Sequence, residues 1–264
     1  MCCVLGIDAA WTVNQPSGVA LATYTGGKWR LVTLASSYDQ FLTQSSGIQV
    51  YRKPIGSLPD AKSLINESVK LAKSEISLIA IDLPMSKTPI TGRRVSDDAV
   101  SRFYGSRHCG THSPSASRPG SLSDSLVRQF DELGFPLMTA RIRLPCLIEV
   151  YPHPALVELA SATSRLPYKV SKTRKYWPNL SLKDRRSMLV LEWQAIVDFL
   201  DEKICGVKEH FLPFEKDLTL SEMKAIEDRL DATVCAWVGI CAVESKAIPY
   251  GDNESAIWIP SNPK

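Results

Sequence analysis

Three short apolar segments of the sequence each lead into a carboxylate. They span residues 4–7, 78–81 and 146–148, and the acids that follow them are Asp8, Asp82 and Glu149. Continuous apolar runs of this length are typical of strands buried on both faces. A carboxylate at such a place is costly unless it is paired or binds a cation. Because the three positions look equivalent, we expect the acids to converge on one site, where oxygen ligands favour Mg²⁺ or Mn²⁺.

A fourth acid precedes a long uncharged segment near the end of the chain. Residues 232–243 contain no charged side chain, so this half of an expected helix should be buried on most sides. Asp231 stands directly before it, and Asp228 lies one turn earlier on nearly the same face. Taken singly, any of these acids could instead cap a loop or form a salt bridge, and Asp228 could be a solvated helix residue. The predicted catalytic and metal-binding set is Asp8, Asp82, Glu149 and Asp231, with Asp228 as an additional metal ligand.

The elements that must position these acids begin with a predicted β-meander. Its three strands are expected at Cys2–Ile7, Ser17–Thr25 and Lys28–Ser36, and the dipeptide Gly26-Gly27 suits the tight turn of a hairpin. A meander followed by strands that alternate with helices predicts a mixed sheet covered by helices. We therefore expect one α/β domain over residues 1–264.

The later elements alternate between strands and helices. Further strands are expected at Leu78–Leu83, Cys146–Tyr151 and Ala256–Ile259. Helices are expected at Pro59–Glu75, Leu122–Leu133, from Pro154, at Leu182–Lys203 and at about Leu220–Val243. Thr219 and Glu222 have the spacing of a capping box at the start of the last helix.

Two polar segments carry most of the clustered positive charge. Residues 84–120 form an expected insert with six Lys or Arg, and residues 165–186 form a basic connection with eight. Tyr168, Tyr176 and Trp177 lie within the second segment, where they could stack on bases while cations hold phosphates. Alternatively, both segments are solvated loops, and His153 only caps the helix that follows it. The predicted substrate-binding residues are Arg93, Arg94, Arg107, His153, Lys169, Arg174 and Lys175.

The composition sets the broad class. The chain has 264 residues, 44% hydrophobic and 22% charged, with a net charge of +3. This mild basicity does not by itself imply a nucleic-acid partner. No stretch is apolar enough to cross a membrane, no signal peptide is recognisable, and seven cysteines without a CxxC pair indicate a reducing, cytoplasmic setting.

The strings that surround the acids resemble a known group of proteins. They are Gly6–Trp11 with Pro16–Gly18, Ile81–Pro84, Ile148–His153, Leu230–Ala232, Tyr250–Asp252 and Ile257–Pro260. Together they resemble the uncharacterised bacterial and archaeal family of predicted RNase H-like nucleases, and the resemblance covers essentially the whole chain. It implies an RNase H-like mixed sheet, in which a three-strand antiparallel meander is joined to parallel strands and flanked by helices. It also implies that Asp8, Asp82, Glu149 and Asp231 are the acidic site residues.

The resemblance extends to chemistry. The spacing of Asp228 and Asp231 is similar to that of the paired helix acids of RuvC-like junction resolvases, although Asp8 is followed by Ala9, Ala10 and Trp11 rather than a glycine-rich tail. The implied reaction is two-metal hydrolysis of a phosphodiester in DNA or RNA. We therefore expect a Mg²⁺- or Mn²⁺-dependent nuclease.

Two other classes remain open at this point. A phosphotransferase of the actin and sugar-kinase superfamily shares such a core, but normally has two such domains and a glycine-rich adenosine motif. A non-catalytic nucleic-acid-binding module could keep the acids as a relic. Metal-dependent cleavage, ATP turnover and salt-sensitive binding without cleavage would separate the three.

Overall fold

The strands of the described residues form one mixed sheet. The structure is a computed structural model that describes residues 2–47, 53–214 and 217–261. The sheet has seven strands in the order β3-β2-β1-β4-β5-β7-β6. In chain order they are β1 Cys2–Asp8, β2 Gly18–Thr25, β3 Lys28–Ala35, β4 Leu78–Asp82, β5 Cys146–Val150, β6 Ala247–Gly251 and β7 Ala256–Pro260. The first three pair antiparallel, β1, β4, β5 and β7 run parallel, and β6 returns antiparallel.

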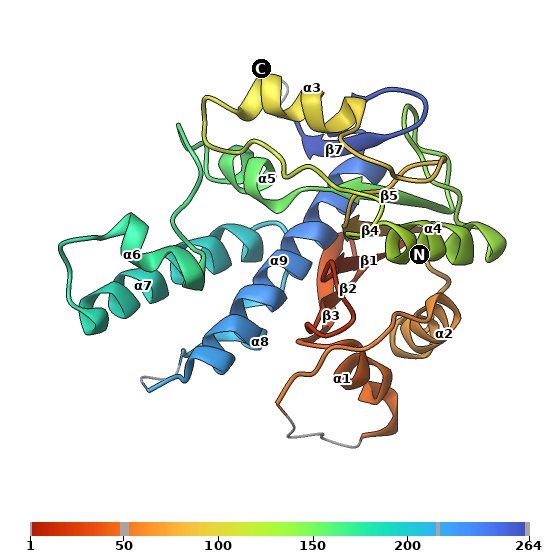
Figure 1. Cartoon of the computed structure of the whole chain (residues 1–264). Coiled ribbons are helices and arrows are strands. Elements are labelled where there is room, and N and C mark those ends of the chain that lie inside the picture. The colour runs from red at the N-terminus through yellow and green to blue at the C-terminus, as the bar shows by residue number, and fades with distance from the viewer. Residues whose placement is uncertain (1, 48–52, 215–216, 262–264) are drawn as a thin grey trace.

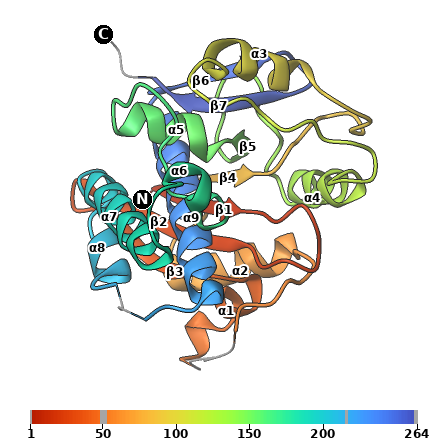
Figure 2. The ribbon, with the colours of Figure 1, turned by 60° about the vertical axis from the view of Figure 1, so that its left-hand side comes forward.

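Helices cover both faces of this sheet (Figures 1 and 2). On one face lie α5 Pro152–Leu159, α7 Leu182–Asp201, α8 Val207–Phe211 and α9 Leu220–Val243. On the other lie α1 Tyr38–Leu42, α2 Ala61–Ala72 and α4 Ser121–Glu132. The third helix, α3 Val95–Tyr104, packs against the end of the sheet formed by β6 and β7. Short turns of helix at Gln44–Ser46, Val170–Lys172 and α6 Thr173–Tyr176 complete the described chain.

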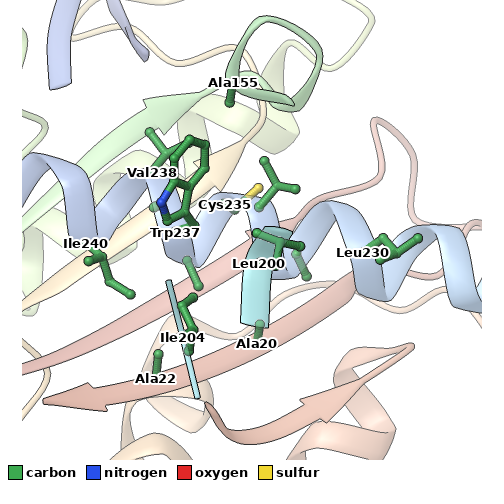
Figure 3. Close-up of a cluster of buried hydrophobic side chains, with 14 of the residues drawn as sticks. Ala20, Ala22, Ala155, Leu200, Ile204, Leu230, Cys235, Trp237, Val238 and Ile240 are labelled. Atoms are coloured by element: carbon green, nitrogen blue, oxygen red, sulfur yellow. The ribbon is translucent and has the colours of Figure 1, made fainter. Parts of the chain in front are cut away.

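The helix α9 lies unusually close to the centre of the sheet, because glycines face it. A Cβ atom at Gly6 would lie 2.4 Å from the carbonyl oxygen of Ala232, and one at Gly18 would lie 2.1 Å from that of Asp228. The same helix closes a large apolar cluster with Ala20 and Leu200, shown in Figure 3. This close approach sets the position of the acids at the N-terminal half of α9 relative to β1.

Most of the expected elements are confirmed. The meander has its turn at Gly26 and Gly27, both with positive φ. The helices at α2, α4, α5, α7 and α9 fall within a few residues of their expected bounds, and the Thr219–Glu222 capping box is formed. The α/β class with a mixed sheet flanked by helices is therefore correct.

Five of the helices and strands named above were not expected, namely β6, α3 and the short helices α1, α6 and α8. The strand β6 contains Pro249, which a strand tolerates at the edge of a sheet, and β6 pairs only with β7. The helix α3 lies inside the segment 84–120, which was expected to be an insert without such structure. It is ten residues long, and an Asp97 carboxylate oxygen accepts the Arg94 backbone N–H at its start. Within the described residues, no helix is long and apolar enough to cross a membrane.

Candidate acidic site

Two of the predicted acids end neighbouring strands on the same face of the sheet. Asp8 is the last residue of β1, Asp82 is the last residue of β4, and the two are direct partners in the parallel register. Side chains alternate along each strand, so both share the face of Val4 and Ala80, which is the face under α9. They line a cavity of about 730 Å³, called here the acid cavity. Neither carboxylate accepts a hydrogen bond or forms an ion pair with a described residue.

The other two aspartates come from α9. Asp228 and Asp231 lie one turn apart on this helix and are almost fully buried. Burial raises the pKa of Asp8 well above its ordinary value, and the nearby Asp231 and Asp228 raise it further. Burial together with Asp231 likewise raises the pKa of Asp82 to about 8. The structure therefore brings four carboxyl groups close enough to repel one another.

Glu149 does not share the position of Asp8 and Asp82. It lies one residue before the end of β5 and is the register partner of Ile81, so its side chain starts on the opposite face, the face of Leu147. The expectation that the three strand acids occupy equivalent places is wrong for this reason. Burial nevertheless raises the pKa of Glu149 to about 7, against the opposing effect of Arg94.

A buried arginine engages Glu149 completely. Arg94 donates to the two Glu149 carboxylate oxygens at 2.6 and 2.8 Å, and to the Met85 carbonyl oxygen at 2.7 Å. Its remaining donors go to Asp97. A guanidinium has five N–H groups, so Arg94 has none left for a substrate. In this structure Arg94 positions Glu149 instead of serving as the expected substrate contact.

Two lysines neutralise the acids of α9. Lys169 contacts an Asp231 carboxylate oxygen, and its Nζ lies 3.4 Å from Glu227. The Nζ of Lys224 lies 2.6 Å from Asp228 and 2.7 Å from Glu227. Burial disfavours the charged form of Lys169, but Asp231, Tyr168, Glu227 and Asp8 together outweigh this effect, so the pKa of Lys169 lies well above its ordinary value. Lys169, expected to face a substrate, is therefore a buried counter-charge in this structure.

The donor atoms suit a hard cation, although the present arrangement is closed by the lysines. Among the residues that the structure describes, no three His, Cys, Asp or Glu side chains are placed to hold a metal ion. The Oδ2 atom of Asp228 is nevertheless buried, and no described residue forms a hydrogen bond with it. The Asp8 and Asp82 carboxylates also stand open to the cavity. These oxygens fit the ligand preference of Mg²⁺ or Mn²⁺, provided that Lys169 and Lys224 withdraw from Asp231 and Asp228.

His153 is connected to the acids through a tyrosine. The Tyr168 hydroxyl donates to an Asp231 carboxylate oxygen at 2.7 Å and lies 3.2 Å from the Nδ1 atom of His153. Burial, together with the positive charges of Lys169 and Arg165, lowers the pKa of His153 well below its ordinary value. Tyr168 is fully buried, so its expected role in stacking on bases is wrong.

The other predicted basic residues lie outside the acid cavity. Arg93 pairs with Asp98 at 2.6 Å, and Arg107 pairs with Glu158 at 2.7 Å. Arg174 and Lys175 are exposed on α6. None of them is brought to Asp8 and Asp82.

Sequence reasoning did not select the two basic residues, Arg118 and Lys224, that line the acid cavity. Arg118 is exposed, forms no ion pair with a described residue, and places its guanidinium 6.0 Å from the centre of the Trp11 ring. Its only signal was membership of the basic segment 84–120. Lys224 and Glu227 were missed as well, although their spacing of three residues on a helix is that of an ion pair.

Comparison with known proteins gives one match. A family model described as "Protein of unknown function (DUF429)" matches residues 6–255. No curated protein and no solved structure matches the chain. The matched region includes all the acids of the site.

Proposed function

Because the chain belongs to the DUF429 family, whose function is unknown, its activity has to be inferred from its own residues, and we propose that it hydrolyses phosphodiester bonds of nucleic acid with the help of Mg²⁺ or Mn²⁺. The proposed cation ligands are Asp8, Asp82, Asp228 and Asp231. Glu149 remains a proposed site residue that acts beside Asp82, since its charge contributes to the raised pKa of Asp82.

The observation that carries this proposal is the pairing of Asp8 and Asp82. Two register-matched carboxylates end adjacent parallel strands, have no hydrogen-bond or ion-pair partner among the described residues, and face a cavity large enough for a backbone segment. Buried acids without partners are costly to the fold, and such groups gather where function requires them. A cation between them would offset the burial and the repulsion from the aspartates of α9 that raise their pKa values.

The topology supports an RNase H-like fold as part of the same proposal. The antiparallel meander β3-β2-β1 continues directly into the parallel strands β4 and β5, with helices on both faces. This is the arrangement that the sequence resemblance implies, and it makes β1 a central strand. Asp8 is then the acid best placed to be shared by two cations.

The chemistry divides between the cations and the chain. Bound cations would activate a water molecule and stabilise the leaving oxygen. Arg118 would hold a phosphate in the acid cavity, which the exposed His112 also lines. Trp11 lines the cavity and offers a ring for a base to stack on. Lys169 and Lys224 would shift from the carboxylates to substrate phosphates as cations take their place.

One observation favours a second candidate, a non-catalytic binding module. The ion pairs of Lys169 with Asp231 and of Lys224 with Asp228 already neutralise two of the acids. If those pairs are permanent, the protein would bind nucleic acid without cutting it.

The test compares the wild type with Asp8→Asn and with a matched control, Asp131→Asn. Asp131 is exposed in the last turn of α4 and has no part in the acid cavity. Each protein is incubated with Mg²⁺ or Mn²⁺ and single-stranded, duplex and branched DNA and RNA, and ATP turnover is measured in parallel. We expect cleavage by the wild type and the control only. Equal cleavage by Asp8→Asn would refute the site, and salt-sensitive binding by all three without cleavage would favour the module.

A further inference from the structure

A second, smaller cavity adjoins the acid cavity. It measures about 170 Å³ and shares Trp11, Asp82 and His112 with its neighbour. We call it the base cavity. An apolar cavity of about 150 Å³ holds one benzene ring, so this volume suits a single six-membered ring and not a fused pair of rings. Trp11 and Tyr151 give it aromatic walls.

The hydrogen-bond network fixes which nitrogen of His153 carries the proton. The single hydroxyl proton of Tyr168 is donated to Asp231, which is also paired with Lys169. The contact between Tyr168 and Nδ1 of His153 therefore requires Nδ1 to be the donor. Burial and the nearby positive charges lower the pKa of His153, which favours the neutral ring, and with the proton on Nδ1 the Nε2 atom of that ring has a free lone pair. Among the described residues Nε2 has no hydrogen-bond partner, and the imidazole lines the base cavity.

Glu149 supplies a second acceptor in the same cavity. Its Oε2 atom accepts from Met85 and Arg94, whereas Oε1 accepts only one N–H of Arg94. Each carboxylate oxygen has two lone-pair sites, so Oε1 can accept another bond. Arg94 holds Glu149 in place by donating to both of its carboxylate oxygens. The polar groups of the base cavity thus present acceptors to a ligand, and a ligand that binds there must present N–H donors.

We propose that the base cavity binds a cytosine base of the nucleic acid whose phosphate is held over Asp8 and Asp82. Cytosine is a single six-membered ring, and its exocyclic amine donates to carboxylates in protein–nucleic acid complexes. Thymine and uracil have an oxygen at that position, which would face the acceptors of Glu149 and His153. Adenine and guanine are too large for the volume. This inference rests on the proposed function, and it adds the identity of the base next to the site of cleavage.

The test measures base preference separately from cleavage. Fluorescein-labelled single strands of eight cytosines, eight thymines or eight adenines are titrated with protein by fluorescence anisotropy, with Ca²⁺ as the cation. We expect the wild type to bind the cytosine strand at least about tenfold more tightly than the other two. His153→Phe keeps a ring but removes the acceptor. In this variant the affinity for the cytosine strand should fall to that for the other two strands, while the affinity for the adenine strand stays unchanged. His210→Phe, at an exposed position on α8, is the matched control and should keep the preference.

A second variant covers the case in which His153→Phe is unstable. Thr111 lines the base cavity and is partly exposed, so Thr111→Trp should fill the cavity without disturbing the core. It should lower cytosine binding to the level of adenine. Equal binding of the three strands by the wild type, with metal-dependent cleavage intact, would overturn the base cavity and leave the proposed function standing. Absence of both binding and cleavage would overturn both.

Discussion

Lys169 offers the sharpest perturbation of the acidic site. Its ammonium contacts Asp231 and Glu227, and its side chain is 18% exposed. Lys169→Met keeps the length of the stem and removes only the charge. Breaking a buried ion pair on one side costs about 3–5 kcal/mol. The partial exposure places this case near the lower end, so we expect the metal-free variant to lose about 3 kcal/mol of unfolding free energy.

The same change should strengthen cation binding. Without Lys169, the carboxylate of Asp231 is left unpaired beside Asp8, and a divalent cation no longer competes with an ammonium. A ligand at 100 times its Kd stabilises the folded state by about 2.7 kcal/mol. Saturating Mn²⁺ should therefore recover most of the stability that the variant lost, and it should stabilise the variant more than the wild type.

Urea unfolding in EDTA and in Mn²⁺ tests both effects. The matched control is Lys175→Met, because Lys175 is exposed on α6 and forms no ion pair with a described residue. The free energy of unfolding of this control should match that of the wild type within about 0.5 kcal/mol in both buffers. A Mn²⁺ shift in Lys169→Met no larger than that of the wild type would refute the idea that Lys169 occupies the place of a cation.

Three further outcomes follow from the same geometry. The pKa of Asp82 is about 8 in the folded, metal-free protein and about 4 in the unfolded chain. Protonation of Asp82 therefore stabilises the fold fully below about pH 4, and this contribution is lost as the pH rises through about 8. Unfolding free energy in EDTA should therefore fall between pH 6 and 8, by at most about 1.4 kcal/mol per pH unit for this group, and Asp82→Asn should flatten the curve. Gly6→Ala would place a Cβ atom 2.4 Å from the Ala232 carbonyl oxygen. It should lower the free energy of unfolding in urea by about 1–3 kcal/mol, and unchanged stability would contradict the close packing of α9. Arg118→Gln should weaken binding to all single-stranded oligonucleotides alike, and it should lower the slope of log affinity against log salt concentration by about one. A slope equal to that of the wild type would show that Arg118 does not bind a phosphate.

Local sequence signals were sufficient for the elements at the centre of the fold. The apolar runs before Asp8 and Asp82, the Gly26-Gly27 turn and the capping box at Thr219 each act over a few residues, and each was placed correctly. The helix α3 was missed because it is only ten residues long, lies in a segment rich in Pro, Ser, Gly and Arg, and packs against β6 and β7. Such packing joins segments about 150 residues apart, and a local sequence pattern does not indicate contacts over that separation.

The placement of Glu149 depended on register, which the sequence does not display. The apolar run before it resembles those before the two aspartates, but β5 continues to Val150, and pairing with β4 sets Glu149 beside Ile81. A shift of one residue along a strand moves a side chain to the other face. The inward position of Lys169 was equally hidden, because a run of positive residues is typical of surface segments and only the acids of α9 make one of them a buried partner.

A crystal structure of the protein soaked with Mn²⁺ tests the central claim most directly. The anomalous signal of manganese identifies the ion without reference to the protein coordinates. The account predicts Mn²⁺ bound by the carboxylates of Asp8 and Asp82, with Lys169 withdrawn from Asp231. Manganese absent from these carboxylates at saturating concentration, with the Lys169–Asp231 pair intact, would contradict it.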